Sequence, residues 1–240
     1  MRWFRLTRVL SLAAAFAAVL VFTAAASGDL TYARQLLRRG EYALAEVTLK
    51  KQLDEFPAEG RALLVRVYLL EGDFDEATRY LEAAREKGLR EAQYYALKGR
   101  IAVMRGDWDA AWAAFRSAVA LSGRAVDALY WGSVGLAQGN LDRALLGFDK
   151  AGRAGATAHA AFLRGLALLP RAPARALAEF RSAQAELASE DPIKPQTIYW
   201  QARALERLGK VREARSTLRF LLRTYPGYGP AREVLNRLGP

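Results

Sequence analysis

From about residue 28 to residue 238, apolar residues recur at helical spacing in segments that end near a glycine or a proline. Spacings of three and four residues place side chains on one face of a helix. Alanine, leucine, arginine and glutamate dominate these segments and β-branched residues are sparse, a composition that favours helices over strands. The pattern therefore predicts an all-α fold.

A short phrase also recurs at nearly constant intervals. It consists of glycine, an aromatic or aliphatic residue two positions later, and alanine three positions after that. Its occurrences are Gly40, Tyr42, Ala45; Gly72, Phe74, Ala77; Gly106, Trp108, Ala111; Gly139, Leu141, Ala144; and Gly209, Val211, Ala214. The first four glycines are 32, 34 and 33 residues apart, and such a period indicates stacked supersecondary units. A further copy keeps Ala176, Phe180 and Ala183 but has a proline-bearing corner at Pro173 in place of the glycine.

Each copy of the phrase has the features of a helical hairpin. The glycine can adopt the left-handed conformation that ends a helix. The next helix begins with an acidic or amide residue, which the helix dipole favours there: Glu41, Asp73, Asp107 and Asn140. The alanine permits two helices to approach closely, and a large residue four positions later fills the space between units: Leu49, Leu81, Phe115, Phe148, Phe180 and Leu218. One hairpin cannot bury that face, whereas stacked hairpins can.

The spacing of alanine, three residues and phenylalanine resembles the second helix of tetratricopeptide repeats, and Pro57, Pro226 and the pair Tyr95 and Gly99 match other positions of that family. The resemblance covers residues 28–238. It implies an α-solenoid of about six helix-turn-helix repeats with a C-terminal capping helix. The apolar run Val9–Ala26 separately predicts an N-terminal hydrophobic helix before the repeats. The expected units are residues 28–57, 58–91, 92–124, 125–156, 157–188 and 195–226, with the cap at 227–238. The polar loop Ser189–Pro195 is the expected place for an internal break.

Residues 1–26 have the features of a targeting segment. Arg2, Arg5 and Arg8 precede an uncharged run, Val9–Ala26, which ends in small residues before Ser27. The length of this run suits either a signal peptide or a short membrane-spanning anchor, and its basic flank places the rest of the chain outside the cytoplasm. We therefore expect a periplasmic or secreted protein after signal cleavage. The alternative is a protein anchored by one N-terminal transmembrane helix with its repeats outside the cytoplasm.

The residue inventory argues against catalysis. The chain contains no cysteine and one histidine, His159, so thiolate chemistry and multi-histidine metal sites are excluded. It has no glycine-rich phosphate loop and no serine nucleophile turn. We expect neither enzymatic activity nor a cofactor or metal. The net charge is +11, and three of the positive charges precede Val9. A surplus of positive charge favours binding to nucleic acid, anionic lipid or an acidic protein. The expected export of the chain argues against nucleic acid as the partner.

The resemblance implies that the first helices of successive repeats line a concave groove that receives a peptide or a partner helix. Counting six residues back from each turn glycine, or matching Gly165 to Gly99, gives one groove position per unit: Arg34, Arg66, Arg100, Ser133, Leu166 and Arg203. Four of these are arginines. The alternative interpretation is that arginine is abundant in this chain and occupies solvent-exposed helix positions without a binding role. Leu37, Leu69 and Val103 are the expected apolar floor, Phe162 and Leu166 the expected pocket at one end, and Tyr199 a further groove residue.

We therefore expect a protein-interaction scaffold that faces the cell exterior and binds a segment or helix of a bacterial envelope protein. Arginine forks pair with carboxylates, so the expected partner carries an acidic segment or a terminal carboxylate. Membrane contact is expected only through the N-terminal segment. The alternative is an accessory or substrate-binding subunit of a peptidoglycan-acting or secretion enzyme complex.

Overall fold

The predicted helical hairpins are the main feature of the computed structural model, which describes residues 30–239. Within that range the chain forms thirteen α-helices and no strand. The expected signal peptide or anchor, residues 1–26, lies outside the described residues. None of the helices from α2 to α14 is both long enough and apolar enough to cross a membrane. The all-α prediction is confirmed for the described chain.

The helices follow one another through short turns. Their bounds are α2 Thr31–Arg39, α3 Tyr42–Lys51, α4 Pro57–Glu71, α5 Phe74–Glu86, α6 Glu91–Arg105, α7 Trp108–Ser122, α8 Ala125–Ala137, α9 Leu141–Arg153, α10 Thr157–Leu168, α11 Pro173–Glu186, α12 Lys194–Arg207, α13 Val211–Thr224 and α14 Gly229–Arg237. The described chain divides within α8 into two compact units, an N-terminal unit of residues 30–134 and a C-terminal unit of residues 135–239.

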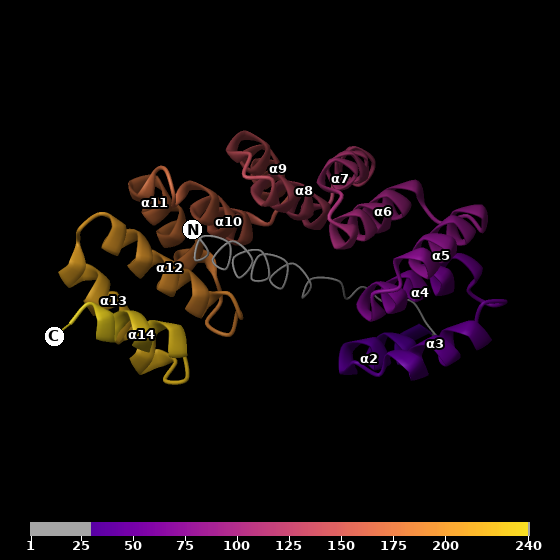
Figure 1. Ribbon diagram of the computed structural model, residues 1–240, viewed down its shortest axis with the longest axis horizontal. Helices are drawn as coiled ribbons and strands as arrows, with labels where there is room; N and C mark the ends of the chain where they lie inside the picture. Colours follow the sequence, from indigo (N-terminus) through magenta and orange to yellow (C-terminus); the bar gives the residue numbers. More distant parts are fainter. Residues whose placement is uncertain (1–29, 240) are drawn as a thin grey trace. The chain divides into compact units, whose positions relative to one another are not determined.

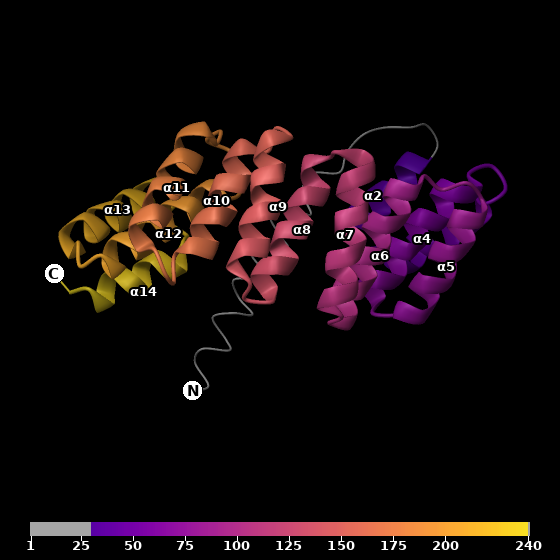
Figure 2. The ribbon, with the colours of Figure 1, turned by 90° about the horizontal axis from the view of Figure 1, so that it is seen from above.

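In the N-terminal unit, each helix packs against the next one along the chain from α2 to α7. Figures 1 and 2 show α4, α5, α6 and α7 running side by side. The first helices α4 and α6 of two successive hairpins also contact each other. This contact brings equivalent positions of neighbouring first helices onto one face of the unit.

The turns form as the sequence predicts. Gly72 and Gly106 end their helices in the left-handed conformation, with φ of 82° and 77°. The carboxylates of Asp73 and Asp107 then accept hydrogen bonds from backbone N–H groups of the next helix, at 3.0 Å in both cases. Glu41 differs because its side chain caps nothing. The left-handed glycine at the end of one helix and the aspartate cap at the start of the next satisfy backbone C=O and N–H groups that the helix ends would otherwise leave unpaired.

Close packing between helices depends on small residues. The six phrase alanines are fully buried, namely Ala45, Ala77, Ala111, Ala144, Ala176 and Ala214. Glycine serves the same purpose opposite the large rings. A Cβ atom on Gly99 would lie 2.9 Å from the ring of Phe115, and one on Gly165 would lie 2.5 Å from the ring of Phe180. Since real Cβ contacts are longer, each ring occupies the space that a side chain would need.

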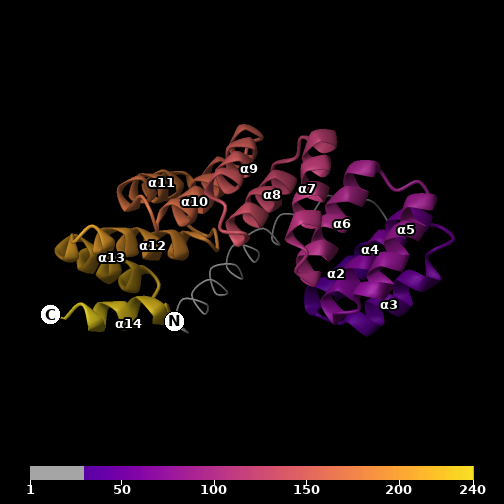
Figure 3. The ribbon, with the colours of Figure 1, turned by 45° about the horizontal axis from the view of Figure 1, so that its top comes forward.

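In the C-terminal unit, α9 packs on α10, α10 on α11, α11 on α12, α12 on α13 and α13 on α14. Figure 3 shows α12 and α13 lying between the α10–α11 pair and α14. Ala231 and Val234 of α14 join Ile198 of α12 and Leu221 of α13 in one apolar cluster. α14 therefore covers the end of the stack, as the expected capping helix would.

The expected internal break at Ser189–Pro195 is wrong, because the chain divides within α8 instead. The loop is fastened to the C-terminal unit by polar contacts. Lys194 Nζ donates to the carbonyl of Leu187 at 2.6 Å, and the Tyr225 hydroxyl donates to the carbonyl of Ser189 at 3.1 Å. Asp191 accepts from the backbone N–H of Ile193 at 2.9 Å and lies 3.8 Å from His159. These contacts order a loop whose composition alone indicates a linker.

Candidate peptide-binding face

Three of the expected groove arginines lie in the N-terminal unit, on the first helices α2, α4 and α6. Arg34, Arg66 and Arg100 occupy equivalent places, each six residues before the glycine that ends its helix. All three side chains are half-buried. The contact between α4 and α6 places equivalent positions of successive first helices on one face of the unit, here called the shared face.

The electrostatics of Arg66 show that these side chains gather. Burial lowers the pKa of the Arg66 guanidinium below its usual range, and the positive charge of Arg100 lowers it further. Arg34 and Arg38 add smaller repulsive effects in the same direction. The stack therefore brings the arginines of three successive first helices close enough to repel one another.

A column of aromatic rings holds Arg100 in place. Its guanidinium lies over the ring of Tyr130, 4.8 Å from the centroid. Tyr130 in turn stacks on Phe115, with centroids 5.2 Å apart and planes 5° apart. Phe115 is the ring that fills the space left by Gly99. The close packing of one hairpin thus fixes the position of a charged side chain on the shared face, through a cation–π contact.

No carboxylate neutralises Arg66 or Arg100 among residues 30–239, where neither has an ion pair or a hydrogen bond. The Nε atom of Arg100 is buried without a hydrogen-bond partner. Carboxylates of the second helices pair elsewhere, for example Glu46 with Lys50 at 2.6 Å and Asp75 with Arg105 at 2.7 Å. The shared face therefore carries positive charge that its own unit does not neutralise.

Apolar side chains accompany these arginines, but they are not the expected ones. Leu37 and Leu69 are buried in the core of the N-terminal unit and Val103 is half-buried. Leu70 and Met104 are instead exposed, at 50% and 53%. They follow Arg66 and Arg100 by four residues, so each lies next to its arginine on the same side of the helix.

The fourth expected arginine, Arg203, belongs to the C-terminal unit and has partners of its own. Its Nε lies 2.9 Å from Glu206, and its Nη1 donates to the Tyr199 hydroxyl at 3.0 Å. Glu206 also pairs with Arg237 of α14 at 2.7 Å. The Tyr199 ring packs against Tyr228, with centroids 5.7 Å apart. Arg203 therefore links α12 to the cap instead of repeating the environment of Arg66.

The expected apolar pocket at Phe162 and Leu166 is also wrong. Phe162 is 0% exposed and Leu166 is 8% exposed. Phe162 packs against Phe180, with ring centroids 6.1 Å apart, between α10 and α11. Ser133, at the corresponding place on α8, is buried as well. Phe162 fills the interior of the hairpin and is not available to a partner.

Comparison with known proteins agrees with this architecture. Residues 36–101 match the family model described as "Tetratricopeptide repeat". The chain has the tetratricopeptide-repeat fold. No curated protein matches it. Within residues 30–239 no group of three or more histidine, aspartate or glutamate side chains is placed so that it could hold a metal ion.

Several solved structures resemble the chain in fold. Pseudomonas aeruginosa pilF superposes with a TM-score of 0.66 at 20% identity, covering 87% of this chain and 95% of that one. The Cut9 and Hcn1 hetero-tetramer of the APC/C gives 0.67 at 15% identity, covering 88% of this chain but only 42% of that one. YrrB, described as a TPR protein with an unusual peptide-binding site, gives 0.57 at 17% identity, covering 78% and 96%.

The repeat register explains which residues sequence reasoning missed. Arg38, Leu70 and Met104 each stand two residues before the turn glycine of their repeat. This is the next exposed position along the face that carries Arg34, Arg66 and Arg100. The repeat count, applied at this second position, would have grouped Arg38, Leu70 and Met104, but it would not have shown that Leu70 and Met104 are exposed.

Proposed function

We propose that the protein is a non-catalytic interaction scaffold outside the cytoplasm, and that the N-terminal unit binds an acidic segment or a terminal carboxylate of an envelope protein. Tetratricopeptide repeats bind protein or peptide partners. The observation that carries the specific proposal is the pair Arg66 and Arg100, half-buried on adjacent first helices with no carboxylate partner among the described residues.

A bound carboxylate would compensate the positive charge of Arg66 and Arg100. Like charges in a partly desolvated place raise the free energy of the unbound protein. A bound carboxylate would relieve that repulsion and accept hydrogen bonds from the guanidinium groups. Each such charge-assisted bond contributes about 1.5–3 kcal/mol when it is shielded from water. The half-buried setting of Arg66 and Arg100 provides part of that shielding, which a fully exposed arginine lacks.

Leu70 and Met104 add an apolar requirement to the acidic one. Each lies one helical turn from its arginine, a rise of about 6 Å along the helix. A segment with a carboxylate and an apolar side chain at a similar spacing would contact both. Methionine is flexible and polarisable, so Met104 can adapt to side chains of different shape. We therefore expect acidic residues interspersed with apolar ones in the partner.

Location outside the cytoplasm is supported by the basic flank and the apolar run of residues 1–26. A reporter that is active only outside the cytoplasm, fused after Pro240, should be active. N-terminal sequencing should find Ser27 or a near neighbour, or else the full-length chain should remain in the membrane fraction. A soluble cytoplasmic protein that begins at Met1 would refute this part of the proposal.

Binding can be tested with fluorescein-labelled hexaglutamate, with hexaglutamine as the neutral probe. Fluorescence anisotropy should show hexaglutamate binding that weakens with salt. Changing Arg66 and Arg100 together to Gln should weaken it at least tenfold, or about 1.4 kcal/mol. The control changes Arg90 and Arg116 to Gln, which removes the same charge from exposed positions of the same unit. Equal affinity and equal salt dependence for the two double variants would contradict the proposal.

A further inference from the structure

A second group of arginines lies on α13 of the C-terminal unit. Arg212, Arg215, Arg219 and Arg223 are spaced by three, four and four residues, which places them on one side of the helix. The opposite side is buried, through Ala214, Leu218 and Leu221. The four arginines, here called the arginine face, therefore form a row along one side of α13, in which Arg212, Arg219 and Arg223 are exposed and Arg215 is half-buried. The row is about 17 Å long at the rise of an α-helix.

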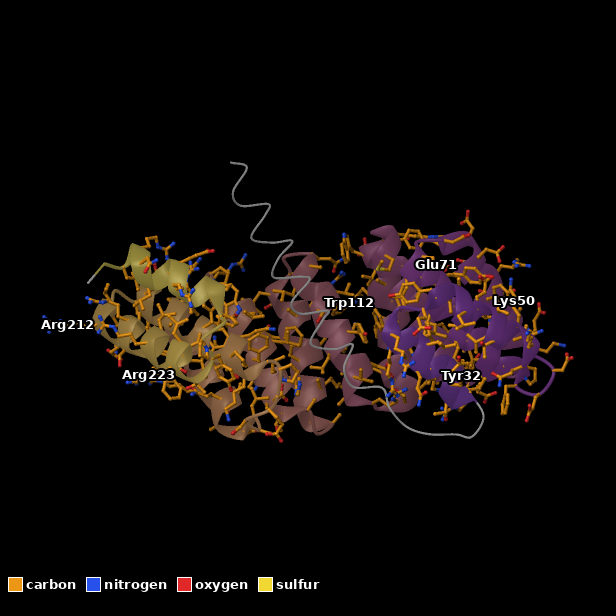
Figure 4. All side chains as sticks on the ribbon, turned by 90° about the horizontal axis from the view of Figure 1, so that it is seen from below. Tyr32, Lys50, Glu71, Trp112, Arg212 and Arg223 are labelled. Atoms are coloured by element: carbon orange, nitrogen blue, oxygen red, sulfur yellow. The ribbon has the colours of Figure 1, made fainter. Side chains whose placement is uncertain are left out.

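The arginine face has no internal partner. Arg212, Arg219 and Arg223 are exposed, and no hydrogen bond or ion pair joins their side chains to any residue within 30–239. Figure 4 shows Arg212 and Arg223 on the outside of the C-terminal unit. The single acidic residue of α13, Glu213, pairs with Lys210 at 3.3 Å. Like charges at this spacing destabilise a helix, so the row is not explained by the stability of the fold.

An apolar element lies beside the arginine face. Phe220 is 44% exposed, although it is a large aromatic residue. It lines a cleft of about 450 Å³ between α11 and α13, whose other walls include the cationic side chains of Arg181 and Lys194. An exposed aromatic ring flanked by basic side chains on two helices suits a partner that is anionic on its surface and apolar beneath it.

We propose that the arginine face and Phe220 form a docking surface for an anionic lipid bilayer. The row faces outward along one helix, so a broad anionic plane can contact all of it at once, and polybasic surfaces bind such membranes by charge. Phe220 would enter the boundary between headgroups and acyl chains. This inference rests in part on the proposed location outside the cytoplasm: export directed by residues 1–26 would bring the chain to a membrane and keep it from nucleic acid. This contact is additional to the membrane contact expected of the N-terminal segment.

The absence of cysteine permits a local test on the full-length chain. Ser216 is exposed and stands between Arg215 and Arg219, so S216C can carry a single environment-sensitive fluorophore. The labelled protein is reconstituted with phosphatidylcholine vesicles, or with vesicles that also contain phosphatidylglycerol, each carrying a lipid-borne contact quencher. Because every variant keeps the same N-terminal segment, differences between variants report the arginine face and not insertion of that segment.

We expect at least twofold stronger quenching in phosphatidylglycerol vesicles than in neutral ones, and loss of that difference at about 0.5 M salt, where charges are screened within a few ångströms. Changing Arg212, Arg219 and Arg223 to Gln should abolish the difference. The control that changes Arg90, Arg116 and Arg124 to Gln removes the same charge from the other unit and should retain it. Phe220→Ser should reduce quenching but keep its dependence on salt.

Three results would overturn the proposal. The first is equal quenching in neutral and anionic vesicles, and the second is unchanged quenching in the arginine-face variant when circular dichroism confirms its helical fold. The third is a change in the fluorescence of the label when hexaglutamate or an oligonucleotide is added, with no quenching by anionic vesicles. That result would assign the arginine face to an acidic protein or a nucleic acid. The R66Q/R100Q variant should behave like the wild type here, so this proposal can fail or succeed independently of peptide binding.

Discussion

Replacing Gly99 by Ala tests how repeat packing controls the candidate site. The new Cβ would lie 2.9 Å from three carbon atoms of the Phe115 ring, and Phe115 is fully buried. Overpacking of this kind costs about 1–3 kcal/mol, whereas Ala gains about 1 kcal/mol over Gly inside a helix. We expect a net destabilisation between about 0 and 2 kcal/mol.

Gly152→Ala is the matched control. Gly152 also lies in a helix, α9, but its added Cβ would meet its nearest neighbours at 3.5 Å and 3.7 Å, which is ordinary contact. We expect a gain of about 0.5–1 kcal/mol there. The two substitutions should therefore differ by about 1–3 kcal/mol, equivalent to several degrees in melting temperature for a chain of this size. Thermal unfolding followed by circular dichroism measures the difference.

Two further observations make the test specific. Shrinking the ring with Phe115→Leu in the Gly99→Ala background should recover part of the loss, as a favourable coupling in a double-mutant cycle. Because Phe115 stacks on Tyr130, which carries Arg100, Gly99→Ala should also weaken hexaglutamate binding, and Gly152→Ala should not. The reasoning is refuted if Gly99→Ala stabilises the protein as much as Gly152→Ala does.

Three further predictions concern other parts of the fold. Ala111→Leu should destabilise the protein by about 1–3 kcal/mol in chemical denaturation, because Ala111 is fully buried where two helices meet; unchanged stability would show that the contact can relax. Arg203→Gln should speed amide hydrogen exchange in α14, because Glu206 loses one of its two cationic partners, but it should leave hexaglutamate affinity unchanged. Burial raises the pKa of Tyr228 from 10.0 to about 12, so the folded state holds this proton more tightly and loses stability as pH rises from 10 to 12. Tyr228→Phe should lose less over that window, and equal losses would contradict the assignment.

Much of the fold was predictable because one physical pattern repeats. The period fixed the positions of the turn glycines and of the buried alanines, and the structure confirms both. The convergence of Arg34, Arg66 and Arg100 was predictable for the same reason, since residues at one phase of a stacked repeat share a face. The division within α8 was not, because no glycine- or proline-rich loop marks it in the sequence.

The errors in the candidate site have specific causes. Arg203 was grouped with the other arginines on register alone, although Glu206 stands three residues later and neighbours it on the helix surface. Phe162 and Leu166 belong to the repeat whose corner lacks the usual glycine. They were placed on the groove by register alone, which does not show which side of α10 is buried. Exposure of Met104 was missed because periodicity assigns apolar residues to the interior and cannot identify those left on the surface.

The most direct test of the central claim measures the stability of the Arg66→Met variant with and without hexaglutamate. Methionine keeps an apolar stem but removes the charge. If Arg66 is held beside other arginines to bind an anion, the free variant should melt at a higher temperature than the wild type, because repulsion is relieved. Hexaglutamate should raise the melting temperature of the wild type and leave that of the variant nearly unchanged. A variant that melts at a lower temperature and is still stabilised by hexaglutamate would show that Arg66 supports the fold and does not bind the partner.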